Sequence, residues 1–118
     1  MQESKRQKQV ARLIQEEMTT IFQKEGLSVL QGGMISIAKV MVTPDLLEAR
    51  IHLSFFQVGD AAAVLQGIRE KTGELRGMLG NKLRHQLRRI PELQFYEDDT
   101  LEHVSKIEAL LDKIKKGG

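Results

Sequence analysis

A run of cationic residues beside a glycine is the part of this sequence whose residue types and spacing most suggest chemistry. Residues 69–89 contain seven Lys or Arg but only two Glu, a local balance of +5, although the net charge of the 118-residue chain is only +2. Within this run lies Lys71-Thr72-Gly73, and a glycine lets another molecule approach the backbone closely. Segregated positive charge attracts polyanions, and lysine and arginine bind phosphate groups directly. The pattern therefore indicates an interface for the phosphate backbone of a nucleic acid.

The same charges could instead form an ordinary solvated surface, which is the usual explanation for a charge run. The scarcity of interleaved acids and the adjacent glycine favour nucleic-acid binding over that alternative. A second cationic cluster lies near the N-terminus, at Lys5, Arg6, Lys8 and Arg12. These four residues could be a further phosphate contact, which we favour, or the frayed start of a helix.

No group of residues in the sequence is spaced for catalysis. Asp98 and Asp99 could be paired carboxylates for acid–base work, but two acids at the start of a helix are explained by capping. No serine stands in a nucleophile elbow, and neither a cysteine nor a phosphate-binding Gly-Lys-Ser/Thr occurs. His52, His85 and His103 lack the spacing of a metal site, and the first two are expected to face solvent. We expect a protein that is not an enzyme, with no catalytic residues, no metal site and no cofactor.

Two amphipathic helices are expected towards the ends of the chain. In Ser4–Lys24, apolar residues recur at spacings of three and four, which indicates a helix with one buried face, and Gly26 would end it. Asp98-Asp99-Thr100 would cap a last helix, whose apolar stripe begins at Leu101 and ends at Ile114. The first residues are polar and no apolar run approaches the length of a membrane span. We therefore expect a cytoplasmic protein without a signal peptide or a membrane segment.

The cationic residues of the central run would be carried by two helices that a bend separates. Asp60 is a good N-cap for the first helix, and the bend is expected at Thr72-Gly73. The second helix would run from Glu74 to the residue before Pro91, because proline disfavours helix in the residue that precedes it. Its apolar stripe would consist of Leu75, Leu79, Leu83, Leu87 and Ile90, with Arg84, His85, Arg88 and Arg89 on the opposite side.

Three strands are expected from runs of β-branched and alternating apolar residues. Glu48–Phe56 alternates cleanly, which indicates one buried face and one wet face. Ile35–Thr43 also resembles a strand, but its apolar residues change parity between Ile37 and Val40. Either a bulge or burial on both faces would explain that change. The third strand, Leu93–Tyr96, is short.

The expected order of elements is α-β-β-α-α-β-α, within one domain that spans residues 1–118. So few elements cannot cover both faces of a sheet. The fold class is therefore α+β, a two-layer sandwich with a three-stranded sheet and the helices on one face. Phe56 and Tyr96 are the aromatic residues that could be exposed, which is too few to make the open face a platform for base stacking.

This order of elements resembles a type II KH domain, in which a helix pair clamps nucleic acid at a glycine-containing turn. Within that class the sequence resembles the ribosome-binding factor A family over nearly its whole length, from the first helix to Leu111. The residues that carry the resemblance are Val40–Leu46, Ala49–Phe55, Leu75–Gly80, Arg89–Phe95, Asp98, Thr100, Ile107, Leu110 and Leu111. The Pro-Asp-Leu and Pro-Glu-Leu elements among them make the resemblance fairly specific.

Three features depart from the pattern of that family. Its members have an Ala-x-Gly kink in place of the GxxG loop of ordinary KH domains, and this chain has Lys71-Thr72-Gly73 there. The lysine could add a phosphate contact or project into solvent. The run between Gly80 and Pro91 is slightly longer than usual, and the basic pair before Val10 is displaced. A literal GxxG does occur at Gly77–Gly80, but we expect these glycines to be close-packing positions within a helix.

The resemblance implies a ribosome maturation factor that binds the free 30S subunit and its rRNA and assists late 16S rRNA processing and assembly. It would be a monomer whose partners are the small subunit with its rRNA, and also ribosomal proteins and assembly GTPases. The alternative is a protein-interaction module that docks on a ribosomal protein or an assembly GTPase through its acidic last helix. The residues expected to bind RNA are Lys5, Arg6, Lys8, Arg12, Arg69, Lys71, Thr72, Gly73, Arg76, Lys82, Arg84, His85, Arg88 and Arg89.

Overall fold

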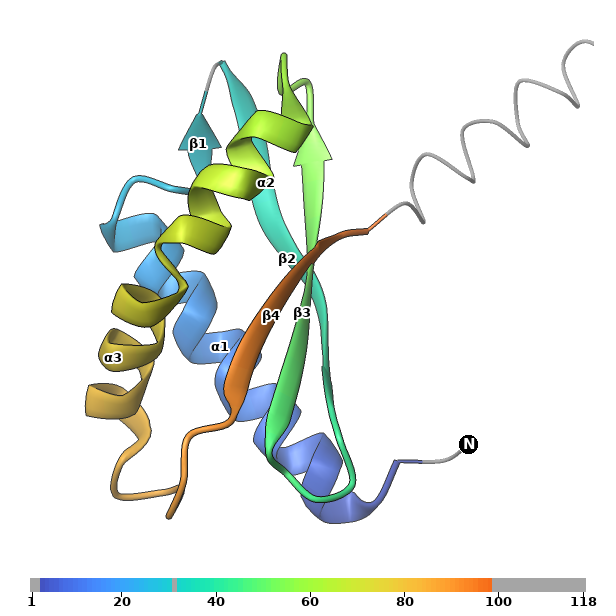
Figure 1. Ribbon diagram of the computed structural model, residues 1–118, viewed down its shortest axis with the longest axis vertical. Helices are drawn as coiled ribbons and strands as arrows, with labels where there is room; N and C mark the ends of the chain where they lie inside the picture. The colour runs from blue at the N-terminus through green and yellow to red at the C-terminus, as the bar shows by residue number, and fades with distance from the viewer. Residues whose placement is uncertain (1–2, 31, 99–118) are drawn as a thin grey trace, which may run out of the picture.

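The computed structural model describes residues 3–30 and 32–98, in which three helices and four strands follow one another (Figure 1). In chain order the elements are α1 (Lys5–Lys24), β1 (Val29–Leu30), β2 (Gly33–Val42), β3 (Glu48–Phe56), α2 (Ala61–Glu70), α3 (Thr72–Leu83) and β4 (Glu92–Glu97). The predicted α+β class is confirmed. The sheet has four strands rather than the three expected, because β1 is too short to leave a pattern in the sequence. The last helix predicted after Asp98 lies outside the described residues.

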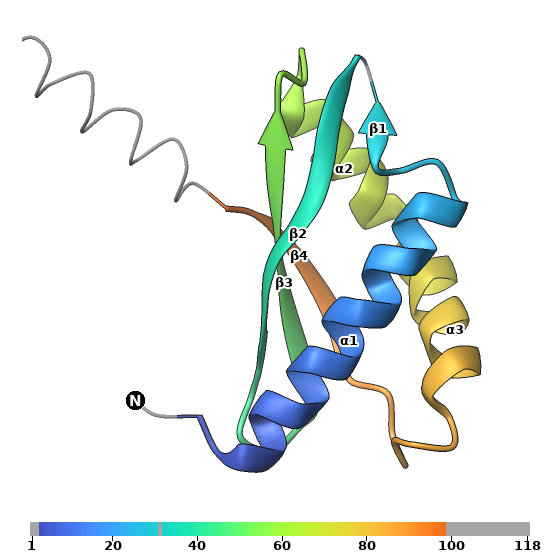
Figure 2. The ribbon, with the colours of Figure 1, turned by 180° about the vertical axis from the view of Figure 1, so that it is seen from behind.

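The sheet has the order β1-β2-β3-β4, in which β1 pairs with β2 and β2 pairs with β3 in antiparallel fashion. Strands β3 and β4 are parallel. A parallel pair needs a long crossover connection, which helices α2 and α3 supply here. All three helices lie on the same side of the curled sheet in both ribbon views (Figures 1 and 2). This is the two-layer arrangement that the sequence predicts.

A bulge in β2 explains the change of parity in its apolar residues. The register with β3 shifts between Ile37, which pairs with Leu53, and Lys39, which pairs with His52. Ala38 is therefore an extra residue, which turns the following side chains over without breaking the strand. As a result, Ile37 and Val40 are both buried although their positions differ in parity. Of the two explanations that the sequence leaves open, the bulge is the one observed.

Helix α1 is fastened to the sheet at its first turn. Ser4 and Gln7 form a capping box, in which the Ser4 Oγ accepts from the Gln7 N–H at 3.1 Å and the Gln7 Oε1 accepts from the Ser4 N–H at 2.7 Å. The buried Gln7 amide also donates to the carbonyl oxygen of Val42 at 2.8 Å. The helix stops before Gly26, whose φ of 70° is left-handed and favours glycine.

The core lies between the three helices and the side of the sheet that faces them. Its most buried side chains come from both layers: Val10, Ile14, Met18, Phe22, Ile51, Leu53, Ile68, Leu75, Leu79 and Leu83. The ring of Phe22 lies 6.3 Å from that of Phe95, measured between centroids, so the first helix meets the last strand inside the core. Among the described residues, no helix combines the length and the apolar character needed to cross a lipid bilayer.

Candidate nucleic-acid interface

The predicted break between the two central helices is present, but it lies at Lys71 rather than at Thr72-Gly73. Helix α2 ends at Glu70 and α3 begins at Thr72. Lys71 has φ of −94° and ψ of 6°, a conformation open to any residue, and the Thr72 hydroxyl donates to the carbonyl oxygen of Arg69 at 2.7 Å. The chain therefore turns without a left-handed glycine. Gly73 lies in the first turn of α3, exposed, so its lack of a side chain leaves the surface beside the break open.

The prediction that Gly77 and Gly80 are close-packing positions is wrong for Gly77. A Cβ atom built there would meet nothing within 4 Å, and the residue is exposed. A Cβ at Gly80 would lie 3.5 Å from the Ile90 side chain, which is an ordinary van der Waals contact. Neither glycine is required for packing against another element. Both lie inside helix α3, so this GxxG does not form a loop like that of an ordinary KH domain.

Two arginines that we expect to bind RNA hold the last strand in place. The Nε and Nη2 of Arg69 both donate to the carbonyl oxygen of Phe95, at 3.1 and 2.9 Å. The Nε of Arg76 donates to the carbonyl oxygen of Pro91 at 3.1 Å, and its Nη2 donates to that of Ile90 at 2.7 Å. These guanidinium groups satisfy backbone carbonyls at both ends of β4. Sequence reasoning missed this structural role because the carbonyls that accept lie far along the chain.

Replacing Arg76 with Gln should lower the free energy of unfolding by about 1–2 kcal/mol, because the variant cannot form the two hydrogen bonds that the charged group donates. Urea denaturation followed by circular dichroism measures this change. Replacing Arg12 with Gln is the matched control, since within residues 3–30 and 32–98 Arg12 pairs only with Glu16, at 3.1 Å on the exposed surface of α1. Equal stability of the two variants would show that the contacts of Arg76 do not hold β4.

The cationic residues after α3 do not lie on a helix, contrary to the prediction. Helix α3 ends at Leu83, and residues 84–90 form turns that lead back to β4. Leu87 stays buried, at 5% exposure, and the N–H of Glu92 donates to the carbonyl oxygen of Leu47 at 2.8 Å. The helix must end early because β4 has to return beside β3. We call residues 82–89 the basic segment; its exposed cationic or titratable side chains are Lys82, Arg84, His85, Arg88 and Arg89.

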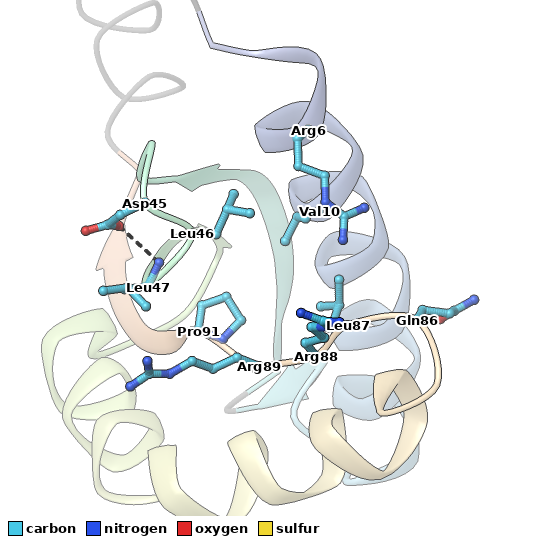
Figure 3. Close-up of a pocket in the computed structure, with 10 residues that line it drawn as sticks. All are labelled: Arg6, Val10, Asp45, Leu46, Leu47, Gln86, Leu87, Arg88, Arg89 and Pro91. Carbon is cyan, nitrogen blue, oxygen red and sulfur yellow. Dashed lines mark hydrogen bonds between the residues drawn. The ribbon is translucent and has the colours of Figure 1, made fainter.

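The structure brings one residue of the N-terminal cationic cluster to the basic segment. Arg6 of α1 lines a cavity of about 410 Å³ together with Arg88 and Arg89 (Figure 3). We call it the arginine cavity; its other lining residues are Val10, Asp45, Leu46, Leu47, Gln86, Leu87 and Pro91. Lys5, Lys8 and Arg12 are exposed on α1 but do not line it. The break at Lys71 lies at the opposite end of α3, whose 12 residues span about 18 Å.

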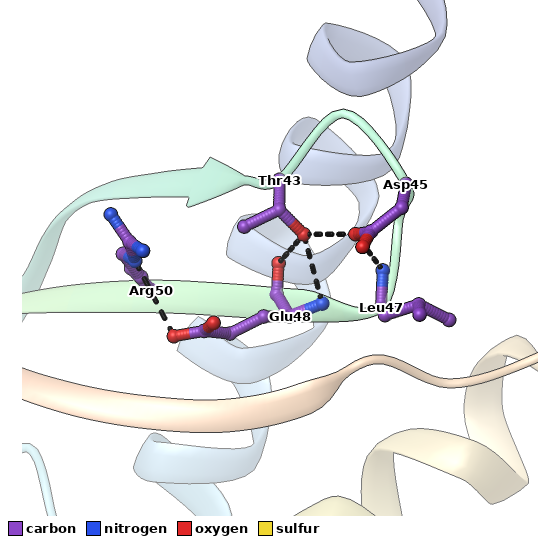
Figure 4. A network of polar contacts seen from close by, with 5 residues as sticks. All are labelled: Thr43, Asp45, Leu47, Glu48 and Arg50. Carbon is purple, nitrogen blue, oxygen red and sulfur yellow. Dashed lines mark hydrogen bonds and ion pairs between the residues drawn. The ribbon is translucent and has the colours of Figure 1, made fainter.

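The turn between β2 and β3 forms one wall of the arginine cavity, which the sequence did not suggest. Thr43 Oγ1 donates to Asp45 Oδ1 at 2.6 Å, and the N–H of Leu47 donates to the same oxygen at 3.0 Å (Figure 4). The N–H of Glu48 in turn donates to Thr43 Oγ1 at 3.1 Å. The hydrogen bonds that Asp45 accepts, above all the one from Thr43 and then the one from Leu47, lower the pKa of its carboxyl group. The hydrogen bonds of this turn also hold the backbone of Leu46 at a left-handed φ of 62°, so the turn has a fixed conformation.

The open face of the sheet carries an aromatic pair with cations beside it. His52 of β3 pairs in register with Tyr96 of β4, and their rings stack with centroids 5.5 Å apart. Burial lowers the pKa of His52, and the positive charge of Lys39 acts in the same direction, whereas Asp98 opposes it and Arg50 supports it. The pair turns its rings toward each other, so the open face presents less free aromatic surface than two separate rings would.

The lowered pKa of His52 should make stability depend on pH. In the unfolded chain His52 binds a proton near pH 6.5, whereas in the folded chain it does so only at lower pH. The contribution of neutral His52 to the free energy of unfolding is therefore complete above pH 6.5 and is lost as the pH falls through the folded pKa. The free energy of unfolding should therefore decrease more between about pH 7.5 and 5 in the wild type than in His52→Gln. Urea denaturation at the two pH values measures this. The same decrease in both proteins would contradict it.

Comparison with known sequences settles which family these elements belong to. The sequence model described as Ribosome-binding factor A matches residues 6–111. The ribosome-binding factor A of Cytophaga hutchinsonii is 43% identical over 112 residues, which cover 95% of this chain and 84% of that protein. The chain belongs to the ribosome-binding factor A family. The paired strands β2 and β3 and the helix pair α2 and α3 all fall inside the matched region.

Solved structures of the ribosome-binding factor A family share the fold. The crystal structure of the factor from Thermus thermophilus matches with a TM-score of 0.65 at 14% identity, over 77% of this chain and 94% of that one. A second Thermus thermophilus structure, a homology model fitted into a cryo-EM map of a complex of the factor with the 30S, matches with a TM-score of 0.61 at 16% identity, over 75% and 90%. At these identities the likeness supports the fold alone.

Proposed function

We propose that this protein is a ribosome maturation factor that binds the free small ribosomal subunit through its rRNA and assists late processing of 16S rRNA in the cytoplasm. The observation that carries the proposal is the meeting of Arg6 with Arg88 and Arg89 around one cavity, in a chain of the ribosome-binding factor A family. The Thermus thermophilus factor, fitted into a map of its 30S complex, supports the choice of partner. Ribosomal proteins and assembly GTPases would be further partners.

The action that these residues support is binding and rearrangement of RNA rather than bond chemistry. Among the described residues, no three His, Asp or Glu side chains gather as they would to hold a metal ion. The exposed guanidinium groups of the basic segment can donate to phosphate oxygens in pairs. The logarithm of the affinity should then fall by roughly 0.7 to 0.9 for each neutralised phosphate per tenfold rise in salt.

Sedimentation with ribosomal fractions tests the proposal directly. A tagged full-length chain is expected to migrate with free small subunits and to be absent from large subunits and from translating ribosomes. Raising the salt should release it, because phosphate contacts release counterions. An even distribution over every RNA-containing fraction would reduce the protein to a nonspecific RNA binder, and its absence from all of them would overturn the proposal.

The break at Lys71 should be a second contact for RNA, which a methyl group at Gly73 tests. Space for a Cβ is open there, so Gly73→Ala should raise the free energy of unfolding by about 0.5–1 kcal/mol through helix propensity. The same methyl should weaken binding to small subunits by roughly fivefold, because a KH-like break holds the RNA backbone against a glycine. Filter binding and urea denaturation measure the two effects.

The matched control for Gly73→Ala is Gly67→Ala in α2. A Cβ at Gly67 also meets nothing within 4 Å, so this variant should gain similar stability. Its binding to small subunits should equal that of the wild type. Unchanged binding by Gly73→Ala would instead place the RNA elsewhere and leave the basic segment as the interface.

A further inference from the structure

The arginine cavity is larger than contacts with phosphate groups alone require. It lies between α1, the turn at residues 43–48 and the basic segment, three parts of the chain that are far apart in the sequence (Figure 3). Its volume of about 410 Å³ falls within the roughly 300–1,000 Å³ typical of sites for small organic ligands. A flat basic surface would neutralise phosphates equally well without a cavity. The shape therefore suits a ligand that has an uncharged part to fill the cavity as well as a charged group.

The charged part of such a ligand must be anionic. Arg6, Arg88 and Arg89 make no hydrogen bond or ion pair with the described residues, so their N–H groups remain available. Arg6 extends from α1 towards Arg88, whereas Arg89 extends to the far side of the cavity (Figure 3). The carboxylate of Asp45 points outward and already accepts from Thr43 and Leu47. The Gln86 side chain also points away from the cavity (Figure 3), so the arginines are the polar side chains available to an incoming ligand.

Apart from Asp45 and Gln86, the remaining lining of the cavity is apolar. Val10, Leu87 and Pro91 form a floor that is almost completely buried, with Val10 at 2% and Leu87 at 5% exposure. Leu46 is half-buried and, like Pro91, lines the cavity from the side opposite α1 (Figure 3). An apolar surface flanked by arginines suits the face of a nucleobase, which loses water on contact while its phosphate remains bound.

We propose that the arginine cavity binds one unpaired nucleotide, with its phosphate between Arg6 and Arg88 and its base against Leu46 and Pro91. This inference rests on the proposed function, because the nucleotide would be an unstacked residue of the bound rRNA. Recognition of unpaired bases is the usual way in which proteins select sites on folded RNA. The cavity then adds selectivity for single-stranded positions, whereas the exposed part of the basic segment supplies phosphate contacts that any RNA can make.

Titration of the full chain with adenosine 5′-monophosphate and with inorganic phosphate separates the two parts of the site. Amide resonances of Leu46, Leu47 and Leu87 are expected to shift with the nucleotide, at a concentration roughly tenfold lower than with phosphate, because the base adds its own contact. Equal concentrations for the two ligands would overturn the proposal and leave an anion site only. Shifts confined to residues 69–73 would overturn it as well.

Two variants and a control distinguish the contact with the base from the contact with the phosphate. Leu46→Asn keeps the charge and tolerates the left-handed backbone at φ of 62°, and it should abolish the preference for the nucleotide while phosphate binding stays the same. Arg6→Gln with Arg88→Gln, both exposed positions, should weaken both ligands by about tenfold. Lys24→Gln at the other end of α1 should change neither. Wild-type behaviour of Leu46→Asn and of the double variant would overturn the proposal.

A single-stranded oligoribonucleotide and its duplex identify the source of the nucleotide. The single strand should bind more tightly than adenosine 5′-monophosphate and compete with it, whereas the duplex should leave the Leu46 amide unshifted. Micromolar binding of the mononucleotide with no gain from the longer strand would overturn the RNA source in favour of a free nucleotide. Wild-type protein that sediments with small subunits but shows no nucleotide shift would refute the cavity alone. Protein that shows the shift but never sediments with them would refute the proposed function alone.

Discussion

Replacing Arg84, Arg88 and Arg89 together with Glu is expected to lower the affinity for free small subunits about a hundredfold or more at moderate salt. Each of these side chains is exposed in the basic segment, so the change removes attraction to phosphates and adds repulsion without touching the core. The dependence on salt should flatten as well, by roughly 0.7 to 0.9 in the slope of log affinity against log salt for each phosphate that the variant no longer neutralises. Binding measured by sedimentation over a range of salt concentrations gives both quantities.

The control for the triple variant must carry the same net charge. Lys24→Glu, Lys39→Glu and Arg50→Glu reverse three exposed cations on α1 and on the open face of the sheet. This control should lose far less affinity and keep most of the salt dependence, because long-range attraction alone is screened within about 10 Å at 0.1 M salt. If the triple variant at 84, 88 and 89 bound small subunits with an unchanged salt slope, the RNA contact of the basic segment would be refuted.

Replacing Phe22 with Ala is expected to lower the free energy of unfolding by about 3–5 kcal/mol, since it empties a large volume of the core. Phe22 is 2% exposed and its ring contacts that of Phe95, so it joins α1 to β4. Much of the total stability of a small domain would be lost. Urea denaturation of the full chain measures the effect.

Phe56→Ala is the matched control for the change at Phe22. The side chain of Phe56 is 58% exposed on the open face of the sheet, so its removal should alter the free energy of unfolding by about 0.5 kcal/mol or less. Similar losses in the two variants would mean that the ring at position 22 is not a core element. A loss at position 56 alone would contradict the exposed position of the Phe56 ring.

Sequence periodicity predicts the helices and strands well wherever a long buried face repeats. Helix α1 begins within one residue of its prediction, and β3 occupies the predicted Glu48–Phe56. The family resemblance supplied what periodicity could not, namely which type of α+β fold connects these elements. Strand β1 escaped notice because two residues carry no period.

The errors lie where tertiary structure decides against local pattern. The apolar spacing through Leu87 and Ile90 continues the helical period, yet α3 ends at Leu83, because the chain has to reach β4 beside β3. Leu87 fills its core position from a turn instead. Likewise Gly77 sits next to an apolar stripe but faces solvent. The spacing of apolar residues in the sequence thus predicts which residues are buried better than it predicts whether they lie in a helix or in a turn.

The candidate site was predictable in its charge and not in its shape. Arg6, Arg88 and Arg89 stand out in the sequence as cations, but nothing local indicates that they border one cavity. The wall made by Leu46 and Leu47 comes from the turn between β2 and β3, whose Pro-Asp-Leu residues contributed to the family resemblance but gave no sign of a cavity. Conversely, Arg69 and Arg76 were predicted to bind RNA because of their charge. That they donate hydrogen bonds to backbone carbonyl oxygens could be seen only from the three-dimensional structure.

The parallel pairing of β3 with β4 also governs when, during synthesis, the interface can exist. Glu48 pairs with Glu92 only after both intervening helices have been made, and the Arg76 contacts to Ile90 and Pro91 close at the same stage. Pairings between distant parts of a chain form late in folding. A nascent chain that has released α1 and the first strands from the exit tunnel therefore carries Arg6 without the other wall of its cavity. The arginine cavity is therefore complete only after β4 has been made and has paired with β3.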